Sequence, residues 1–338
     1  MRSPRHFRRR GPLACLLWPS SLLFCALVRL RRGLYRHGLL PSKRLPVPVI
    51  VVGNLTVGGV GKTPLVIHLV GELRAMGWTP GVVARGYRGE SSHWPLSLGD
   101  DCDARLGGDE PCLIARRCRV PVCVGPDRPA AARQLLDEHP DVDVLLSDDG
   151  LQHYRLRRDL ELAVVDAARG LENGLCLPAG PLREPRSRLD AVDMVLYNGN
   201  ERVRFGMAVR IRDLAALDAD DERWPIASFS GRRVHAVAGI GNPERFFATL
   251  ERAGIEVVRH PFPDHHAYHP EELRFEPSLP ILMTEKDAVK CRGFGLEDAW
   301  QVRVDLHLNE LAFIGLRRLL REKLQSWRRS TLPRPDDT

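Results

Sequence analysis

The segment that most constrains the fold is Gly53-Asn-Leu-Thr-Val-Gly-Gly-Val-Gly-Lys-Thr-Pro64. It follows a short β-branched run, residues 47–52, and precedes a helical pattern over residues 64–76. A buried strand, a glycine-rich turn and a helix in this order form a phosphate-binding P-loop, because the backbone N–H groups and the helix N-terminus then face the phosphates. The residues expected to bind nucleotide are Thr56, Val57, Gly58, Gly59, Val60, Gly61, Lys62 and Thr63.

Two side chains of this loop have a predicted chemical role. Lys62 is placed to reach the β- and γ-phosphate oxygens of ATP, and the Thr63 hydroxyl is placed to hold Mg²⁺. The loop departs from the common pattern at Thr56, six residues before Lys62, where glycine usually stands. The sequence therefore predicts a variant P-loop that uses ATP and Mg²⁺.

Short apolar runs alternate with helical patterns along the rest of the chain, which predicts a parallel, doubly wound α/β sheet. Strands are expected at 81–84, 120–124, 142–146, 162–165, 234–238 and 281–283, with helices at 129–138 and 243–252. We expect three parts: an N-terminal membrane-associated segment (1–36), a P-loop domain (37–225) and a smaller α/β domain (226–338). A C-terminal helix of the smaller α/β domain is a candidate to pack back on the P-loop domain.

A second polar segment, Ser147-Asp-Asp-Gly-Leu-Gln-His153, directly follows an apolar predicted strand. In P-loop proteins an Asp at the end of a neighbouring parallel strand holds Mg²⁺, directly or through water. Asp148 and Asp149 can share this task, and the sequence leaves open which of them touches the metal. A polar turn at the end of a strand is the alternative interpretation.

Two further segments carry candidate acid–base residues. In Gly107-Gly-Asp-Glu-Pro111 a carboxylate could act as a base, but Asp and Glu are common at helix N-termini, and the residues alone favour a capping role. In Pro263-Asp-His-His-Ala-Tyr-His269 the histidines could bind a metal or supply a base whose tautomer Asp264 or a distant carboxylate fixes. A solvated loop is the alternative for this second segment.

The N-terminus is both apolar and basic. Residues 12–30 are mostly apolar, arginines flank both ends, and no Asp or Glu occurs before Glu72. A spanning helix needs ~20 apolar residues, and it would carry one basic cluster across the bilayer, against the positive-inside tendency. We therefore expect a helix that lies in the membrane interface with its arginines at anionic headgroups. A spanning helix and a buried core helix are the alternatives.

Composition narrows the classes of partner. The net charge of +7 favours anionic partners. A nucleic-acid binder is disfavoured because the basic residues gather beside the apolar segment and only 6% of the residues are aromatic. The 8 cysteines include no CxxC pair, which argues against zinc and indicates reduced thiols. The runner-up function is a membrane-associated P-loop ATPase that switches partners, although such proteins usually carry lysine at the position of Val57.

Taken together, these motifs resemble the tetraacyldisaccharide 4′-kinase family, the lipid A 4′-kinases of Gram-negative bacteria. The resemblance runs from about residue 12 to 320, and the set of motifs in this order is far more specific than any one of them. The matching segments are residues 53–64, 84–89, 108–111, 148–153, 178–184, 239–243, 262–266 and 284–288.

The resemblance implies an ATP- and Mg²⁺-dependent kinase of lipid A biosynthesis that phosphorylates the 4′-hydroxyl of a tetraacyldisaccharide 1-phosphate, giving lipid IVA. It also implies a monotopic or peripheral enzyme on the cytoplasmic face of the inner membrane, with a glycolipid substrate and no evident obligate protein partner. In the family an aspartate and a histidine are thought to work as a pair. Here these are Asp109 and His265, and His266 is left possible.

The resemblance and the motifs together give one set of expected site residues. The catalytic candidates are Lys62, Asp109, Asp149 and His265. The metal candidates are Thr63, Asp148, Asp149 and Glu184. The substrate candidates are Arg85, Arg88, Glu110 and Arg183, of which the arginines could hold the 1-phosphate. Because Asp109 and His265 lie in different predicted domains, we expect domain closure over ATP and lipid to bring them together.

Overall fold

The computed structural model describes residues 4–219 and 222–331 of the chain. Its strands form one large sheet in the order β11-β10-β12-β13-β8-β7-β6-β1-β5-β2-β4-β3, with β9 paired to β8. This arrangement confirms the predicted α/β class. The strands are β1 Val49–Gly53, β2 Pro80–Ala84, β3 Leu96–Leu98, β4 Val122–Val124, β5 Val144–Ser147, β6 Leu160–Asp166, β7 Met194–Asn198, β8 Gly206–Ala216, β9 Arg223–Trp224, β10 Arg233–Ala238, β11 Glu256–Pro261, β12 Ile281–Thr284 and β13 Ala299–Leu308.

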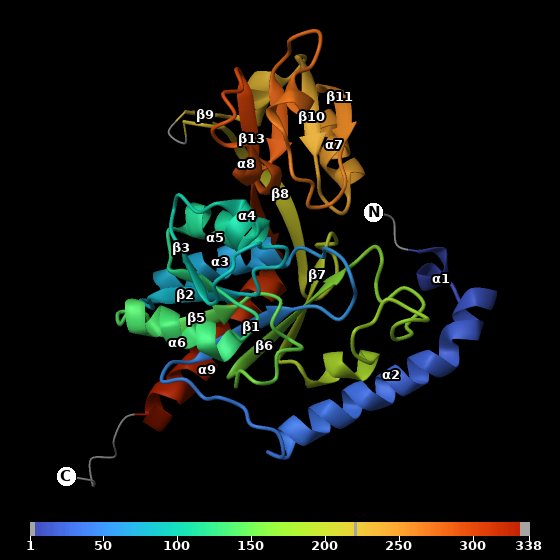
Figure 1. Cartoon of the computed structure of the whole chain (residues 1–338), viewed down its shortest axis with the longest axis vertical. Helices are drawn as coiled ribbons and strands as arrows, with labels where there is room; N and C mark the ends of the chain where they lie inside the picture. The colour runs from blue at the N-terminus through green and yellow to red at the C-terminus, as the bar shows by residue number, and fades with distance from the viewer. Residues whose placement is uncertain (1–3, 220–221, 332–338) are drawn as a thin grey trace.

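Helices cover both faces of this sheet and extend from it at the N-terminus (Figure 1). The α-helices are α1 Arg5–Arg8, α2 Pro12–Arg36, α3 Lys62–Ala75, α4 Ala104–Gly107, α5 Asp109–Cys118, α6 Arg128–Glu138, α7 Pro243–Arg252, α8 Glu285–Cys291 and α9 Glu310–Thr331. Three 3-10 helices, η1 Arg186–Ala191, η2 Ile226–Phe229 and η3 Pro270–Leu273, complete the described secondary structure.

The first half of the molecule is a parallel sheet with β1 at its centre. β1 pairs in parallel with β5 on one side and β6 on the other, and all five of its residues are buried. They are buried because α3, α5 and α9 cover one face of the sheet, whereas α6 covers the other. A β-branched run buried on both faces is the pattern expected of such a central strand. The loops at the carboxyl ends of these strands build the nucleotide side of the site.

The second half continues the same sheet. β10 lies between β11 and β12 and pairs with both in parallel. A long antiparallel pair, β8 with β13, joins the two halves and runs from Trp300↔Ala216 to Leu308↔Met207. The predicted domain boundary at 225/226 falls just after β9, which is bonded to β8, so the division into domains stays a prediction.

The C-terminal helix α9 returns to the first half. Its buried residues Leu316 and Leu320 belong to the same apolar cluster as α3. Arg317 Nε lies 2.9 Å from Glu72 Oε2 on α3. The chain therefore crosses from the first half to the second and back again, which fixes both halves to one sheet.

The N-terminal helix α2 stands along one edge of the first half (Figure 1). Only Ala14 and Ser21 are buried in it, and Ser21 Oγ donates to the Cys176 carbonyl at 2.7 Å. The helix is long and apolar enough to cross a membrane by length and composition. Its exposed large apolar side chains are Leu13, Leu16, Trp18, Leu22, Leu23, Leu27 and Leu30. This exposure excludes the buried-core alternative for the segment.

Candidate active site

The phosphate loop has the backbone that its sequence predicts. Gly58 and Gly61 have φ of 99° and 92°, a left-handed conformation that side chains disfavour. A Cβ at Gly61 would come within 2.4 Å of Asn198 Nδ2, which donates to the Val60 carbonyl at 2.9 Å. On the other side Val57 N donates to the Pro181 carbonyl at 2.9 Å. The loop is therefore held in shape from both sides by this chain's own residues.

Lys62 and Asp149 form the centre of the nucleotide side. Lys62 Nζ lies 3.4 Å from Asp149 Oδ1 and donates to Asn54 Oδ1 at 3.1 Å. Arg183 Nη1 lies 3.0 Å from Asp149 Oδ2. Burial would raise the pKa of Asp149, but the charges of Lys62 and Arg183 outweigh burial and lower this pKa to about 2. Asp149 is therefore ionised at neutral pH, and Lys62 is held where the loop needs it.

The surroundings of Asp148 indicate whether a divalent cation fits beside the phosphate loop. Its side chain is buried, and burial together with the nearby charge of Glu110 raises its pKa to about 7. Mg²⁺ prefers oxygen donors. Asp148, Asp149 and the hydroxyl of the buried Thr63, at the start of α3, offer such donors. The phosphate loop is open at Gly59, where an added Cβ would meet nothing within 4 Å. These residues fit ATP with Mg²⁺.

Asp109 and His265 meet at the boundary between the two halves. Asp109 opens α5, His265 follows β11, and His265 Nδ1 lies 3.0 Å from Asp109 Oδ2. The capping interpretation of Asp109 is wrong, because Gly108 is the N-cap and the helix has no side-chain cap hydrogen bond. The expected closure is not needed to form the contact, since it is present in the structure as it stands.

The neighbouring His266 has a different partner. Its Nε2 lies 3.0 Å from both carboxylate oxygens of Glu272, within its own loop. His265 has φ of 62°, a conformation that non-glycine residues rarely adopt and that often marks functional positions. Of the two histidines the sequence left open, the geometry therefore brings His265 to Asp109.

Two lysines of α8, which the sequence analysis did not single out, complete this boundary. Lys286 Nζ lies 3.2 Å from His265 Nε2 and 3.2 Å from Glu110 Oε1. Lys290 Nζ lies 3.7 Å from Asp109 Oδ2. Burial would raise the pKa of Asp109, but the hydrogen bond with His265 and the charges of Lys290 and Lys286 hold it below its usual value. Residues 284–288 matched a family segment, yet no local pattern indicated a role for Lys286.

A buried ion pair holds α5 against α8. Arg117 Nη1 lies 3.2 Å from Glu285 Oε1, and Arg117 Nη2 lies 2.8 Å from Asp305 Oδ1 on β13. Glu285 Oε2 also accepts a hydrogen bond from the Val304 N–H at 3.0 Å. Because Asp109 lies at one end of α5 and Lys286 follows Glu285, this brace sets the distance between them.

The other predicted residues are divided between these groups. Glu110 joins Lys286, and Arg183 joins Asp149, as described above. Arg88 Nη1 donates to the Asp264 carbonyl at 3.3 Å, so it reaches the second half. Arg85 is exposed, and its charge acts on His153.

Glu184 is not brought to the phosphate loop. It is buried and accepts a hydrogen bond from Tyr154 Oη at 2.5 Å, and its second oxygen lies 3.3 Å from Arg188 Nε. Both carboxylate oxygens thus have partners that Mg²⁺ would have to displace. Its neighbour Arg183, and not Glu184, is the residue of this segment that contacts Asp149.

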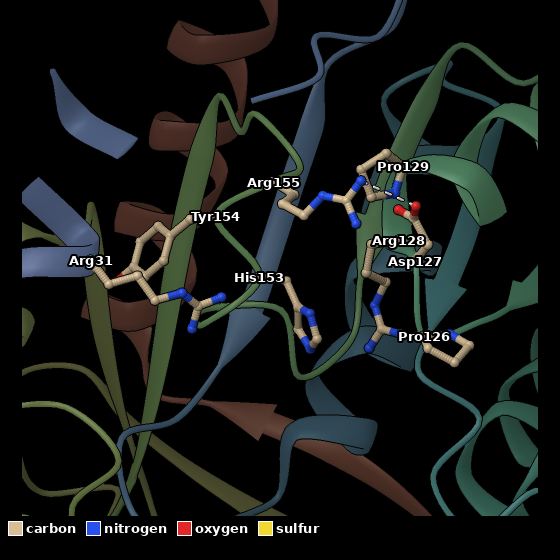
Figure 2. A pocket seen from close by; sticks show the side chains of 8 residues that line it. All are labelled: Arg31, Pro126, Asp127, Arg128, Pro129, His153, Tyr154 and Arg155. Atoms are coloured by element: carbon tan, nitrogen blue, oxygen red, sulfur yellow. Dashed lines mark ion pairs between the residues drawn. The ribbon is translucent and has the colours of Figure 1, made fainter. Parts of the chain in front are cut away.

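A small cationic pocket of about 40 Å³ lies between α2 and the core (Figure 2). Arg31 reaches into it from α2, while Arg128 enters from α6 and His153 from the segment after β5. Arg128 is 1% exposed, and its Nε has no hydrogen-bond partner among the described residues. Burial and the charges of Arg128 and Arg85 lower the pKa of His153 to about 4. His153 is therefore neutral near pH 7, and the positive charge of the pocket comes from Arg31, Arg128 and Arg155. Arg155 Nη2 lies 3.3 Å from Asp127 Oδ2, the acidic residue of the lining, so the remaining positive charge favours an anion.

Comparison with known proteins identifies the family. The family model described as Tetraacyldisaccharide-1-P 4′-kinase matches residues 13–325. A tetraacyldisaccharide 4′-kinase of Azoarcus sp. (strain BH72) is 52% identical over 334 residues, which is 96% of each chain. One of Pseudomonas aeruginosa (strain LESB58) is 50% identical over 297 residues, covering 87% of this chain and 89% of that protein.

A solved structure agrees with the sequence comparisons. The crystal structure of LpxK from Aquifex aeolicus in complex with ATP matches with a TM-score of 0.79 and 30% identity. The match covers 92% of this chain and 99% of that chain. The P-loop, the Asp109–His265 contact and these likenesses over nearly the whole length lead to one conclusion. The chain belongs to the tetraacyldisaccharide-1-P 4′-kinase family.

Proposed function

We propose that this protein transfers the γ-phosphoryl group of ATP to the 4′-hydroxyl of a tetraacyldisaccharide 1-phosphate in lipid A biosynthesis, giving lipid IVA. The observation that carries the proposal is the Asp109–His265 contact at 3.0 Å, in the same molecule as a glycine-rich loop with Lys62. Phosphoryl transfer needs positioning and charge neutralisation more than covalent chemistry by the protein. The two groups of residues supply these two requirements.

The nucleotide side neutralises charge. The N–H groups of the phosphate loop and the start of α3 face the phosphates, and Lys62 reaches the β- and γ-oxygens. When bound, Mg²⁺ would supply positive charge that stabilises the transition state of phosphoryl transfer. Thr63, Asp148 and Asp149 are the residues that would hold it. Asp149 also keeps Lys62 in place through their 3.4 Å contact.

The acceptor side orients the sugar hydroxyl. In this proposal the Asp109–His265 pair receives the 4′-hydroxyl and takes its proton as the new oxygen–phosphorus bond forms. Lys286 and Lys290 hold positive charge around the pair, which keeps the Asp109 carboxylate ionised. Glu110, held by Lys286, lies close enough to influence Asp148 and so links the acceptor side to the metal side.

The phosphate already present on the glycolipid would bind in the cationic pocket of Arg31, Arg128 and His153. Support comes from the chemistry of its lining and from its position beside α2 (Figure 2). Arg31→Ala should raise KM for the glycolipid and leave KM for ATP unchanged. An acceptor without the 1-phosphate should show no difference between the two proteins. Equal KM values for the phosphorylated acceptor would exclude the pocket.

The membrane contact is proposed to be α2, lying at the cytoplasmic face of the inner membrane. Its exposed leucines would enter the acyl boundary and its arginines would meet anionic headgroups. Deleting residues 1–36 should release much of the protein into the soluble fraction and raise apparent KM for a micellar acceptor more than it lowers kcat. Full sedimentation of the deleted form would assign the anchor to another surface. A tag at residue 1 that reacts from the periplasm would show a spanning helix.

The direct test is transfer of labelled phosphate from ATP to a tetraacyldisaccharide 1-phosphate in detergent micelles, read by thin-layer chromatography. A partner-switching ATPase, the alternative, would hydrolyse ATP without this acceptor. ATP turnover that depends on the glycolipid, with label in the lipid, supports the kinase. An ATP turnover rate that is the same with and without the glycolipid supports the partner-switching ATPase.

A further inference from the structure

Lys286 has three polar partners, and one of them is the catalytic histidine. Its Nζ lies 3.2 Å from Glu110 Oε1, 3.5 Å from Asp264 Oδ1 and 3.2 Å from His265 Nε2. Only 16% of its side chain is exposed. Burial would lower the pKa of Lys286, but the charges of Glu110, Asp264 and Asp109 raise it above its usual value. The ammonium group is therefore protonated and faces the imidazole ring.

This contact determines where His265 carries its proton. A protonated lysine has only donors, so the imidazole nitrogen opposite it must be an acceptor. A neutral imidazole whose Nε2 accepts carries its hydrogen on Nδ1. That nitrogen faces Asp109 Oδ2 at 3.0 Å and can donate to it. Lys286 and Asp109 thus favour the same tautomer from opposite sides of the ring.

We infer that Lys286 is a positioning residue that fixes the Nδ1–H tautomer of His265 and leaves the Asp109 carboxylate to take the proton of the sugar hydroxyl. The inference rests on the proposed function, and what it adds is the role of Lys286 in orienting His265 within the pair. His265 Nδ1 and Lys290 both contact Oδ2 of Asp109, so Oδ1 is the oxygen assigned to the hydroxyl. Nε2 is occupied by the ammonium group and does not receive this proton.

The proposed step conserves atoms and electrons. The bond from the 4′-oxygen to the γ-phosphorus forms while the bond from the γ-phosphorus to the β–γ bridging oxygen breaks, and ADP leaves with that electron pair. The hydroxyl proton moves to Asp109. An aspartate suffices for this task in phosphoryl transfer, because the transition state is loose and little base strength is required. His265 orients the carboxylate and remains neutral throughout.

The charged groups around the ring do not all act in the same direction. The groups are Asp109 and Glu110 from α5, Asp264 from the loop after β11, Asp287 and Lys290 from α8, and Arg88 with the Tyr87 ring from the loop after β2. The Asp264 carboxylate lies 3.8 Å from Nε2 and favours a proton there, but the Lys286 ammonium group is closer to Nε2, at 3.2 Å, and has Asp264 Oδ1 as its ion partner at 3.5 Å. A second proton on His265 would place a cation 3.2 Å from the Lys286 ammonium. Repulsion between like charges disfavours that form. Removing the ammonium group should therefore make double protonation of the ring easier.

The first test reads the tautomer directly. Nitrogen NMR of the full-length protein with ¹⁵N-labelled histidine, in detergent micelles, reports protonation of each ring nitrogen, and His265→Gln identifies the signal. We expect the Nδ1–H form in the wild type, and the Nε2–H or doubly protonated form in Lys286→Met. Lys290→Met is the matched control, because it removes the same charge from the same helix and leaves the Nε2 contact in place. It should retain the Nδ1–H form.

The second test separates this role from a purely structural one. Lys286→Met should lower kcat near neutral pH by about tenfold, the scale seen when a partner that orients a histidine is removed. The acid limb of its kcat profile should move to higher pH, because the Lys286 charge is one of the causes that hold the pKa of Asp109 below its usual value, and activity should recover as the pH rises and Asp109 ionises. Lys286→Arg keeps the cation and should retain the wild-type acid limb.

Several results would overturn the inference. They are an Nε2–H tautomer in the wild type, an unchanged tautomer in a folded Lys286→Met variant, or a kcat loss that is equal at every pH. If Lys286→Met does not fold, an Nε2–H signal in Lys286→Arg or in the wild type still refutes it. The proposed function fails separately, when the wild-type protein does not phosphorylate the glycolipid whatever its tautomer.

Discussion

The phosphate loop and the acid–base junction are built in opposite ways. The acid–base junction consists of Asp109, Glu110, His265, Lys286 and Lys290. The loop is one continuous segment whose glycines, lysine and helix start are neighbours in the chain. The junction draws its residues from three segments that only tertiary packing brings together. The groups proposed to bind phosphate are thus encoded locally, whereas the groups proposed to move the proton depend on the contact between the two halves.

The largest expected effect tests the junction. Asp109→Asn keeps the size of the side chain and removes the charge that accepts the proton, so kcat should fall by ~10²–10⁴-fold. ATP binding, measured by calorimetry, should be nearly unchanged because the loop is a separate unit. The double variant with His265→Ala should be little worse than the poorer single variant, since the two residues act together. Additive losses would mean two independent roles.

The next effect tests the loop. Lys62→Ala removes the charge that faces the β- and γ-oxygens, and kcat should fall by about 10²–10³-fold, the range for loss of one transition-state donor. Melting temperature should also fall somewhat, because the Lys62 side chain is only 10% exposed and contacts Asp149 and Asn54, so kcat is compared at a temperature where both proteins are folded. Near-normal turnover would contradict the assignment of the phosphate loop. Thr63→Ala in parallel should raise the Mg²⁺ concentration needed for half-maximal rate.

A third variant asks whether the junction depends on its brace. Arg117→Met breaks the buried pair with Glu285, and removal of one partner of such a pair typically costs ~3–5 kcal/mol of stability. Chemical denaturation should show this loss. In the protein that remains folded, ATP affinity should be retained and kcat reduced, since α5 and α8 then lose their fixed spacing. An equal loss of ATP affinity would contradict the separation of loop and junction.

The smallest effect is expected at the adjacent histidine. His266→Ala removes a contact with Glu272 inside one loop and leaves Asp109 untouched. We expect kcat to change by less than about twofold, the range for a substitution away from the site. Steady-state kinetics beside His265→Ala provides the measurement. Equal losses for the two variants would mean that the 3.0 Å contact does not select His265.

The sequence predicted the regular parts of the fold well, because buried strands and helix starts have local signals. Helix α7 has the predicted bounds, 243–252, and the predicted strands differ from β1, β2, β4, β5, β6, β10 and β12 by at most two residues at each end. It missed β3, β7, β8, β9, β11 and β13. In β8, half-buried and exposed positions are mixed with buried ones, as expected of a strand that leaves the core, so no alternation was visible.

The site was predictable to the extent that its residues carry local patterns. Lys62, Thr63 and the Asp148–Asp149 pair follow a strand or open a helix, and such positions can be recognised in sequence. Lys286 could not be found, because its position in a short helix says nothing about a histidine that comes from another loop. The sequence favoured Asp109 as a helix cap because a carboxylate at a helix start is a strong local signal. Its observed partner, His265, lies far away in the sequence and leaves no local signal.

The long β8–β13 pair has a mechanical consequence for catalysis. Its register runs through nine residue pairs between the halves, with one irregularity between Arg303 and Val304. Such a ribbon bends and twists elastically but does not swing freely as a flexible linker would. Any movement of the two halves that opens the junction would therefore have to bend or twist this paired ribbon. The irregularity at Arg303 is the point where the ribbon should yield first.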